Sequence, residues 1–447
     1  MAASADLSRR ASWGVTWSGV PVGIGASGHP CCLGAEHAVL VLGPPRSGKT
    51  SVVFVPAILE APAAVVSTST KPDVMDATIA WRRRFGQCFL FDPTGSVKRP
   101  ADVAPLRWSP VSACTTYDAA DATAAALSFA ARPGAHLGEA AHWIERAAAL
   151  LGPLLLAANL DGRTIGDVFD WVAAHDVRVA EAVLRAAGEA RAKVVLSGIW
   201  RTEERERSGI FSTCAGVLAA YRSEVVTAAA ARPNFDPDHF AASYDTVYIA
   251  TAATDQERLA PLIVAFLEQI RAAVYRRRRA CPDAAPCLFA LDEVANIAPL
   301  PSLPKLASEG GGQGLVTLAC LQDLSQGRTR WGPEAEGFLT LFAVKVVFPG
   351  VEDARTLEII SQLAGEHLVP MRSVTTPNML SILMRRGHTS TTVHHVWRRR
   401  LPVDAVARGE PGYTLVIEPG AVIEQARAVP YFAYPIWKAR SSGTWSQ

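Results

Sequence analysis

The chain has 447 residues, of which 49% are hydrophobic and 19% are charged. This composition excludes a largely disordered protein, and the length suggests two or three domains. Lysine and arginine number 44 and aspartate and glutamate 42, so the formal charge is only +2. Bulk charge therefore gives no case for binding nucleic acid or an anionic membrane, and any such binding needs a local basic patch.

The cysteines and the apolar runs indicate neither a metal site nor a membrane span. The eight cysteines are scattered and form no C-x-x-C pair. We expect them to be buried as small apolar side chains of a protein in a reducing compartment. The longest apolar run, residues 147–158, contains Gly152 and Pro153 and is shorter than the ~20 residues that cross a membrane. We expect a buried helix there.

The chain opens with an alternating apolar pattern. In WGVTWSGVPVGIG, residues 13–25, alternate apolar side chains lie on either side of a Ser18-Gly19 turn. This pattern predicts a β-hairpin-like lead-in over residues 1–37.

An α/β pattern follows. Residues 38–42, AVLVL, form an apolar run typical of a strand that is buried on both faces. A glycine-rich turn and an apolar helix come next, followed by two further short apolar runs, APAAVVS and QCFLFDP. Strands that alternate with helices indicate a parallel sheet, so we predict the first part of an α/β domain over residues 38–112.

The composition changes near residue 112. From residue 113 to residue 238 the chain is alanine-rich and helical in pattern, which predicts an all-α insertion domain. Strands resume with YDTVYIAT, APCLFALDE, GLVTLACLQD, FLTLFAVKVVFPG and GYTLVIEPG. They predict that the α/β domain continues over residues 239–447. Within it, residues 371–400 are rich in Thr, Ser, His and Arg and are expected to form a mobile surface segment.

The segment GPPRSGKT, residues 43–50, fits the phosphate-binding pattern G-x-x-x-x-G-K-[ST]. It follows a buried strand and opens a helix, so backbone N–H groups and the helix N-terminus can face a phosphate. A glycine-rich loop without a ligand is the alternative. We predict that Lys49 contacts the β- and γ-phosphates of ATP and that Thr50 ligates Mg²⁺. The predicted nucleotide-binding residues are Gly43, Pro44, Arg46, Ser47, Gly48, Lys49, Thr50 and Ser51.

Two further strands end in polar residues that suit the same site. Asp292 and Glu293 follow CLFAL, where Asp292 would hold Mg²⁺ and Glu293 would polarise the attacking water. Gln322 ends the strand LVTLACL and would hydrogen-bond the γ-phosphate or its water. Acids and amides are also common as ordinary residues at strand ends, so both assignments depend on the phosphate loop.

These segments resemble the type IV secretion coupling proteins, the TraG/TraD-like conjugation ATPases. The resemblance rests on LVLGPPRSGKTSVVFVPAIL, FALDEVANIAPLPSLPKLASEG and LACLQDLSQ. RWSPV is similar to the family's Trp-Asn-Pro segment, and VEDARTLEIISQLAG and LPVDAVARGEPGYTLVI resemble segments of its second half. The likeness covers most of the chain outside residues 113–238, which match in helical character.

The resemblance implies a RecA-like P-loop domain with a mainly parallel sheet, interrupted by an all-α domain. It implies a homo-hexameric ring with ATP between subunits. It also implies an ATPase that passes single-stranded DNA, or a relaxase–DNA complex, to the channel components of a type IV secretion system. Carried over residue by residue, Lys49, Thr50, Asp292, Glu293 and Gln322 bind or hydrolyse ATP.

The chain departs from the family pattern in three places. Family members usually begin with transmembrane helices, and this sequence shows none. We therefore expect a cytoplasmic protein, peripheral at the inner face of the cell membrane, that contacts the membrane through a partner. STSTKPD, residues 67–73, stands where the family has an Asp-Pro-Lys type segment. Gly311 lies about where the family's trans-acting arginine is expected, and Arg328, Arg330 and Arg355 are the nearest replacements. The alternatives are an arginine supplied by a partner protein, or a slow ATPase that acts mainly as a switch.

Two other functions fit the same motifs. An FtsK-like or packaging DNA translocase would use this motor outside secretion, and a weakly hydrolysing receptor would bind ATP while sorting protein substrates. Stimulation of ATP hydrolysis by single-stranded DNA would separate a motor from a receptor. Arginine runs at residues 82–84, 276–279 and 398–400 are candidates for facing DNA, although solvated helix ends are the commoner explanation of such runs.

Overall fold

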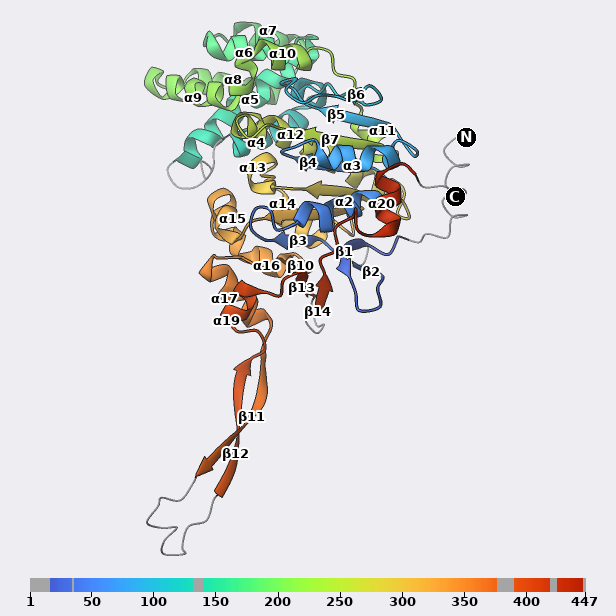
Figure 1. The fold of residues 1–447 in the computed structure, drawn as a ribbon. Coiled ribbons are helices and arrows are strands. Elements are labelled where there is room, and N and C mark those ends of the chain that lie inside the picture. Colours follow the sequence, from blue (N-terminus) through green and yellow to red (C-terminus); the bar gives the residue numbers. More distant parts are fainter. Residues whose placement is uncertain (1–16, 34–35, 132–139, 376–389, 419–423, 445–447) are drawn as a thin grey trace, which may run out of the picture.

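The computed structural model describes residues 17–33, 36–131, 140–375, 390–418 and 424–444. A sheet with helices on both faces forms the centre, a helical part lies at one end, and a long two-stranded ribbon extends from the other end (Figure 1). The elements of the helical part and of the ribbon are inserted between strands of the central sheet.

Twelve strands of the described chain form the central sheet, and the eight from β10 to β6 run parallel. The other four form an antiparallel edge. In spatial order the strands are β2 (Pro30–Leu33), β1 (Val20–Ile24), β14 (Glu424–Arg427), β13 (Tyr413–Ile417), β10 (Val344–Val347), β3 (Val39–Leu42), β9 (Leu315–Leu321), β8 (Cys287–Leu291), β4 (Val65–Ser69), β7 (Thr246–Ala250), β5 (Cys88–Phe91) and β6 (Ala104–Pro105).

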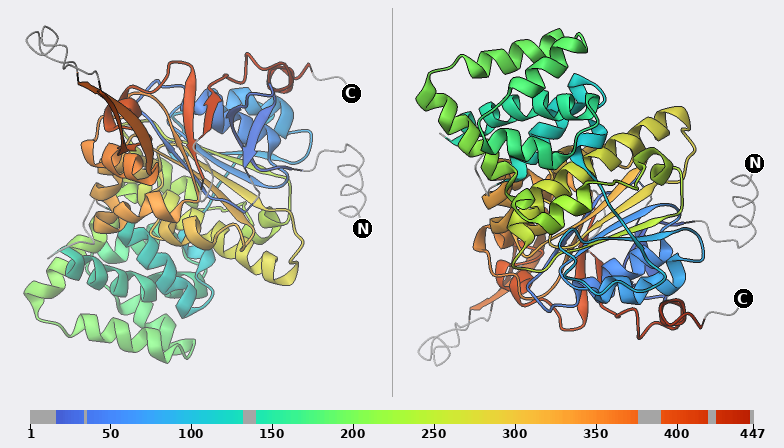
Figure 2. Two further views of the ribbon diagram at one scale, coloured as in Figure 1. Left: turned by 90° about the horizontal axis from the view of Figure 1, so that it is seen from below. Right: turned by 90° about the horizontal axis from the view of Figure 1, so that it is seen from above.

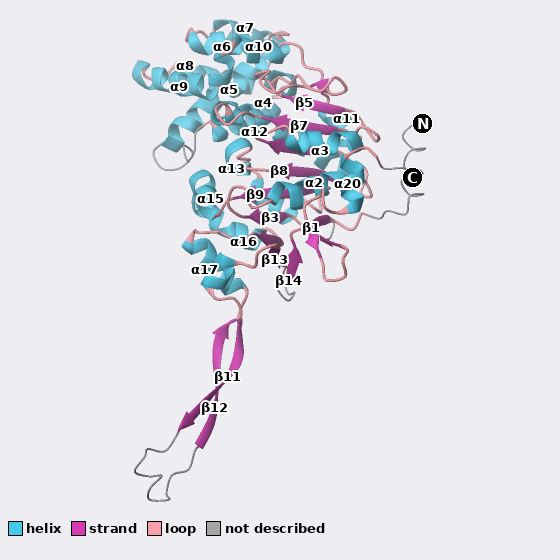
Figure 3. Cartoon of the chain, viewed as in Figure 1, coloured by secondary structure: helices cyan, strands magenta, loops and turns pink. Residues whose placement is uncertain are grey.

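Apolar cores lie on both faces of this sheet. In β3, Val39 and Val41 belong to one core, while Leu40 and Leu42 belong to the other, because successive side chains of a strand point to opposite faces. The continuous apolar run predicted from the sequence is thus buried on both sides. One face is covered by α2 (Val55–Glu60), α3 (Asp73–Arg82) and α20 (Pro435–Ser441), and the other chiefly by α12 (Gln256–Ala280) (Figures 2 and 3).

Every regular element that the structure describes between β6 and β7 is a helix. The central helix, α5 (Ala140–Leu160), packs against five others of this part, α4, α6, α7, α8 and α9. Among the described residues, α5 alone is long and apolar enough to cross a membrane, and 56% of its apolar window is buried inside the protein. The remaining helices are α4 (Tyr117–Ala130), α6 (Ile165–Ala173), α7 (Arg178–Ala186), α8 (Ala190–Trp200), α9 (Glu204–Val217), α10 (Glu224–Ala230) and α11 (Pro237–Ala241).

The N-terminal hairpin differs from the one expected. β1 pairs with β2 through a turn in which Gly25 N donates to His29 O, so the turn is not at Ser18-Gly19. The first expected strand, residues 13–17, lies outside the described residues except for its last position. β1 is buried along its whole length because it also pairs with β14 and joins the central sheet.

One later segment also differs from expectation, and a second is described only in part. FLTLFAVKVVFPG was predicted as one strand, but its first residues form α16 (Phe338–Leu341) and only Val344–Val347 form β10. A short apolar run does not by itself distinguish a buried helix from a strand. Within the expected mobile segment, residues 371–375 and 390–399 belong to the regular strands β11 (Glu366–Thr375) and β12 (Ser390–Arg399), while residues 376–389 lie outside the described residues.

One buried arginine ties two neighbouring strands together. Arg82 ends α3 and is fully buried. Its guanidinium donates to Ala61 O at 3.0 Å and Ala63 O at 2.7 Å, just before β4, and to Tyr244 O at 3.0 Å and Thr246 Oγ1 at 2.8 Å, where β7 begins. A fixed fork of N–H donors makes arginine suited to this task. Arg82 therefore belongs to the core and not to a basic surface that could face DNA.

We expect Arg82→Met to lower the free energy of unfolding by about 3 kcal/mol, because it leaves several buried carbonyl oxygens without a donor. The neighbouring Arg83→Met is the control. Arg83 is more than half exposed and pairs with Asp102, so the expected change is within about 0.5 kcal/mol. Chemical denaturation of both variants measures the difference, and equal effects would contradict the structural role of Arg82.

Candidate nucleotide site

The strand order brings the predicted site residues to one edge of the sheet. β9 lies between β3 and β8, and all three strands are parallel. Their carboxyl ends therefore meet at the same edge, where ligands bind in open α/β sheets. The phosphate loop follows β3, Gln322 follows β9, and Asp292 and Glu293 follow β8.

The phosphate loop needs glycine where the sequence has it. Gly43 N donates to Gln322 O at 3.2 Å, which joins the loop to the end of β9. A Cβ atom on Gly43 would lie 2.7 Å from Cβ of Phe348, and Gly48 has φ +93°. Arg46 also adopts a positive φ of 64°, which is uncommon for a residue with a side chain. The loop is thus held in a tight turn by close packing.

Lys49 folds into the concave side of this loop. Its Nζ donates to Gly43 O at 2.8 Å and to Pro44 O at 2.7 Å. Ser47 Oγ is buried and has no hydrogen-bond partner within the described chain, and Ser51 Oγ donates to Gly48 O at 3.1 Å. An ammonium group, an unpaired hydroxyl and a helix N-terminus together suit a phosphate group.

Thr50 and Asp292 meet across the edge of the sheet. Thr50 Oγ1 donates to Asp292 Oδ2 at 2.7 Å, and Thr68 Oγ1, from β4, donates to the Asp292 carbonyl at 2.9 Å. Asp292 is only 8% exposed. Burial raises the pKa of its carboxyl group, against the opposing effects of the Thr50 hydroxyl and the Lys49 charge. A hydroxyl and a carboxylate in contact are the hard oxygen ligands that fit Mg²⁺.

Glu293 is turned away from the strand by an unusual backbone conformation. Its φ is 52°, in the left-handed region, and its N–H donates to Asp292 Oδ1 at 3.1 Å. The side chain is half-buried, and Asn296 Nδ2 lies 3.5 Å from Glu293 Oε2. Strained residues of this kind cluster at functional sites, where the surrounding structure holds them. The turn separates a buried carboxylate at Asp292 from an accessible one at Glu293.

Packing excludes an arginine at the position of Gly311. A Cβ atom there would lie 2.2 Å from Glu36 O, so no side chain fits without moving the backbone.

The three replacement candidates differ in their availability. Arg328 is held by Asp353, with Nη2 to Oδ1 at 2.7 Å, and Arg330 is buried, which lowers the pKa of its guanidinium. The Arg355 side chain is 65% exposed, with its Nε 3.2 Å from Glu336 Oε2. Among the three, Arg355 has the most exposed side chain.

A C-terminal strap, residues 428–441, lies along the phosphate-loop helix, residues 50–60, and no pattern in the sequence analysis predicted it. The first turn after Lys49 is a π-helix, in which Val55 N donates to Thr50 O. In a π-helix the carbonyl oxygen of Ser51 would accept a hydrogen bond from the N–H of residue 56, but Pro56 has no N–H group. Tyr431 N supplies the missing donor at 2.9 Å. A proline five residues after Ser51 is the only signal in the sequence.

The same strap also binds the far end of that helix. Trp437 is fully buried, and its Nε1 donates to Glu60 Oε1 at 2.9 Å. Arg440 Nη1 lies 2.5 Å from the same Glu60 oxygen. The strap therefore fixes the phosphate-loop helix at both ends.

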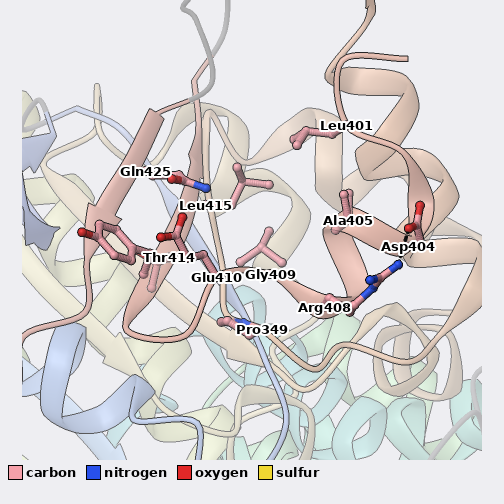
Figure 4. A pocket seen from close by; sticks show the side chains of 13 residues that line it. Pro349, Leu401, Asp404, Ala405, Arg408, Gly409, Glu410, Thr414, Leu415 and Gln425 are labelled. Carbon is pink, nitrogen blue, oxygen red and sulfur yellow. Dashed lines mark hydrogen bonds and ion pairs between the residues drawn. The ribbon is translucent and has the colours of Figure 1, made fainter. Parts of the chain in front are cut away.

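A hollow of about 380 Å³ lies between α19 (Val403–Arg408) and β13. Figure 4 shows the Arg408–Asp404 ion pair at its wall, with Nη2 and Oδ2 2.6 Å apart. Pro349 also lines it, and the next residue, Gly350, packs on Pro44 of the phosphate loop. The hollow and the phosphate loop therefore adjoin the same short segment after β10.

Comparison with known proteins identifies the family. The family model for type IV secretory system conjugative DNA transfer matches residues 13–442. The chain belongs to this family of conjugative coupling proteins. Two Escherichia coli proteins named conjugal transfer protein TraG are each 24% identical to it, over 467 and 464 residues, covering 92% of this chain and 69% of each relative. The resemblance inferred from the sequence is thus confirmed.

Solved structures of the coupling protein TrwB share the fold of this family member. The unbound form lacking 70 N-terminal residues has a TM-score of 0.69 at 19% identity, covering 91% of this chain and 88% of that one. The complex with ADP and Mg²⁺ has a TM-score of 0.68 at 19% identity, covering 92% and 89%. The predicted RecA-like α/β class with an inserted helical part is confirmed.

Replacing the buried carboxylate should stabilise the nucleotide-free coupling protein. Because folding raises the pKa of Asp292 above its ordinary value of 3.8, the ionised group costs stability at neutral pH, and this cost disappears below pH 3.8. Asp292→Asn should therefore raise the thermal midpoint. Glu293→Gln, at a half-buried position, is the control with little change. A midpoint lowered by Asp292→Asn would contradict this electrostatic account.

Proposed function

We propose that this coupling protein binds ATP and Mg²⁺ at the edge formed by β3, β9 and β8 and hydrolyses ATP to drive or gate DNA transfer. The contact between Thr50 Oγ1 and Asp292 Oδ2 carries the proposal. It joins the phosphate loop to the acidic strand end at hydrogen-bond distance, as a shared metal requires. TrwB, which has the same fold, was solved with ADP and Mg²⁺ and with a non-hydrolysable ATP analogue.

The proposed roles follow from exposure and position. Lys49 and the loop N–H groups bind the β- and γ-phosphates, and Thr50 and Asp292 hold the metal, which supplies charge neutralisation at the transferred phosphate. Glu293, half-buried and turned out of the strand, accepts a proton from the attacking water. Gln322 orients that water, because its strand lies between those of the loop and the acids.

We propose that the active form is a ring, a hexamer, with each site completed by a neighbouring copy. Gly311 leaves no room for the family's trans-acting arginine, and Arg355 is the most exposed of the three replacements. We assign Arg355 that role. It lies near the start of α17 (Ala354–Leu363), and its contact with Glu336 is a partly exposed ion pair that costs little to break.

The transported substrate is proposed to be single-stranded DNA or a relaxase–DNA complex, delivered to the type IV secretion channel at the cytoplasmic face of the membrane. Family membership favours this over a packaging or FtsK-like translocase. The pair of acids beside an amide favours a hydrolysing motor over a receptor that only binds ATP.

Two substitutions test the site. Lys49→Ala removes the charge at the phosphates and should abolish measurable ATP binding. Glu293→Gln should bind ATP normally but hydrolyse it about 10²–10⁴ times more slowly, because the amide keeps the shape and loses the base. Fluorescent-nucleotide titration and phosphate release measure the two effects. A folded Lys49→Ala protein with normal ATP binding and turnover would overturn the assignment.

A mixing experiment tests the trans arginine. Arg355→Ala and Glu293→Gln should each be inactive alone, whereas a mixture should regain part of the activity. In some interfaces of a mixed ring, an intact Arg355 then faces an intact Glu293. Arg328→Ala, which removes an arginine already paired with Asp353, is the comparison and should not be complemented in this way. No recovery on mixing, with assembly verified by sizing, would contradict the assignment of Arg355.

A further inference from the structure

The β11–β12 ribbon stands clear of the body of the protein. Its base is fixed where Arg399 Nη2 lies 2.6 Å from Glu358 Oε1 on α17 and Arg400 N donates to Gly365 O at 2.9 Å. Beyond the base the ten-residue strands extend away from the sheet and the helices (Figures 1 and 2). A ribbon of two strands buries little surface by itself, so its side chains remain available to a partner.

One face of the ribbon presents an exposed tryptophan in an apolar setting. Trp397 pairs with Leu368 in the register of the two strands, and these side chains are 63% and 49% exposed. Val374 and Val393 lie further along the same face and are also about half exposed. Exposed apolar side chains gathered in this way mark an interaction surface.

The charge of the ribbon is strongly biased to one sign. Its described residues, 366–375 and 390–400, include four arginines, three histidines and one acid, Glu366, at the base. Their formal charge is +3, although the whole chain carries only +2. Arg372 lies on the same face as Trp397, and Arg398 lies on the opposite face, opposite His367. Both arginines are exposed, so both faces of the ribbon suit an anionic partner.

We propose that this ribbon is an arm that binds single-stranded DNA, with unpaired bases stacking on Trp397, phosphates contacting Arg372 on the same face, and the strand crossing the outer edge of β12 to Arg398 on the opposite face. The inference rests on the proposed function, because it supplies a surface for the transported strand. Aromatic side chains that stack bases beside cations that track the backbone are the usual means of binding a single strand. The bare outer edges of the ribbon carry backbone N–H and C=O groups that need water or polar partners, which argues against insertion into lipid.

Binding of a labelled single-stranded oligonucleotide of mixed sequence to the full chain, measured by anisotropy over a range of salt, tests the proposal. Loss of two phosphate contacts in Arg372→Gln/Arg398→Gln should lower affinity about 15-fold at physiological salt and reduce the salt slope by about 1.4. Trp397→Leu should lower affinity about fivefold or more without changing that slope. Affinity for a non-hydrolysable ATP analogue should stay unchanged in all of these variants.

Matched controls separate the arm from general charge and hydrophobicity. Arg83→Gln/Arg408→Gln removes two exposed arginines elsewhere, and Phe432→Leu removes an exposed aromatic side chain away from the ribbon. Both should keep nearly the wild-type affinity. If the wild-type chain binds no single-stranded DNA, the proposed function fails for the free strand, and the arm fails with it. If the wild-type chain binds single-stranded DNA and the ribbon variants bind it equally well, the arm is wrong and the proposed function stands. The same conclusion follows if the variants lose affinity only for duplex DNA or for anionic vesicles.

Discussion

The parallel run of β3, β9 and β8 is the constraint on which the rest of the protein depends. Parallel neighbours must end at the same edge, so three segments that are far apart in the sequence deliver the phosphate loop, Gln322 and the two acids to one place. The two inserted parts of the chain do not interrupt these three strands. The helical part enters between β6 and β7, and the ribbon enters between β10 and β13, both outside the β3–β9–β8 group.

The site is held by packing around strained backbone. Among the described residues, only Arg46, His175 and Glu293 adopt a positive φ without being glycine, and two of these belong to the proposed site. Phe348 crowds Gly43, and the C-terminal strap binds both ends of the phosphate-loop helix at Ser51 and Glu60. Packing of this kind holds the backbone in strained conformations that an isolated loop would not adopt.

Burial and exposure divide the charged residues into two kinds. Arg82 and Asp292 are buried. Arg82 donates hydrogen bonds to backbone carbonyl oxygens, and Asp292 accepts one from the Thr50 hydroxyl. The arginines of the ribbon are mostly exposed and have few acids near them. A net charge of +2 conceals this division, because composition sums over residues whose surroundings differ. The local fields, not the total, decide what each group can bind.

The sequence by itself determined the elements whose signals are local. The apolar runs identified β3, β4, β5, β7, β8, β9 and β13, the glycine–lysine–threonine pattern identified the phosphate loop, and both polar strand ends were found. Tertiary structure alone decided the rest. The Thr50–Asp292 contact spans 242 positions, the partner of β1 is set by the sheet, and the bond from Tyr431 to Ser51 exists because Pro56 lacks an N–H group. The ribbon's strands pair across the segment between them, with exposed side chains on both faces, so no buried face gives them an alternating pattern. Long-range contacts of this kind leave no periodicity in a single sequence, because they depend on which surfaces the fold brings together.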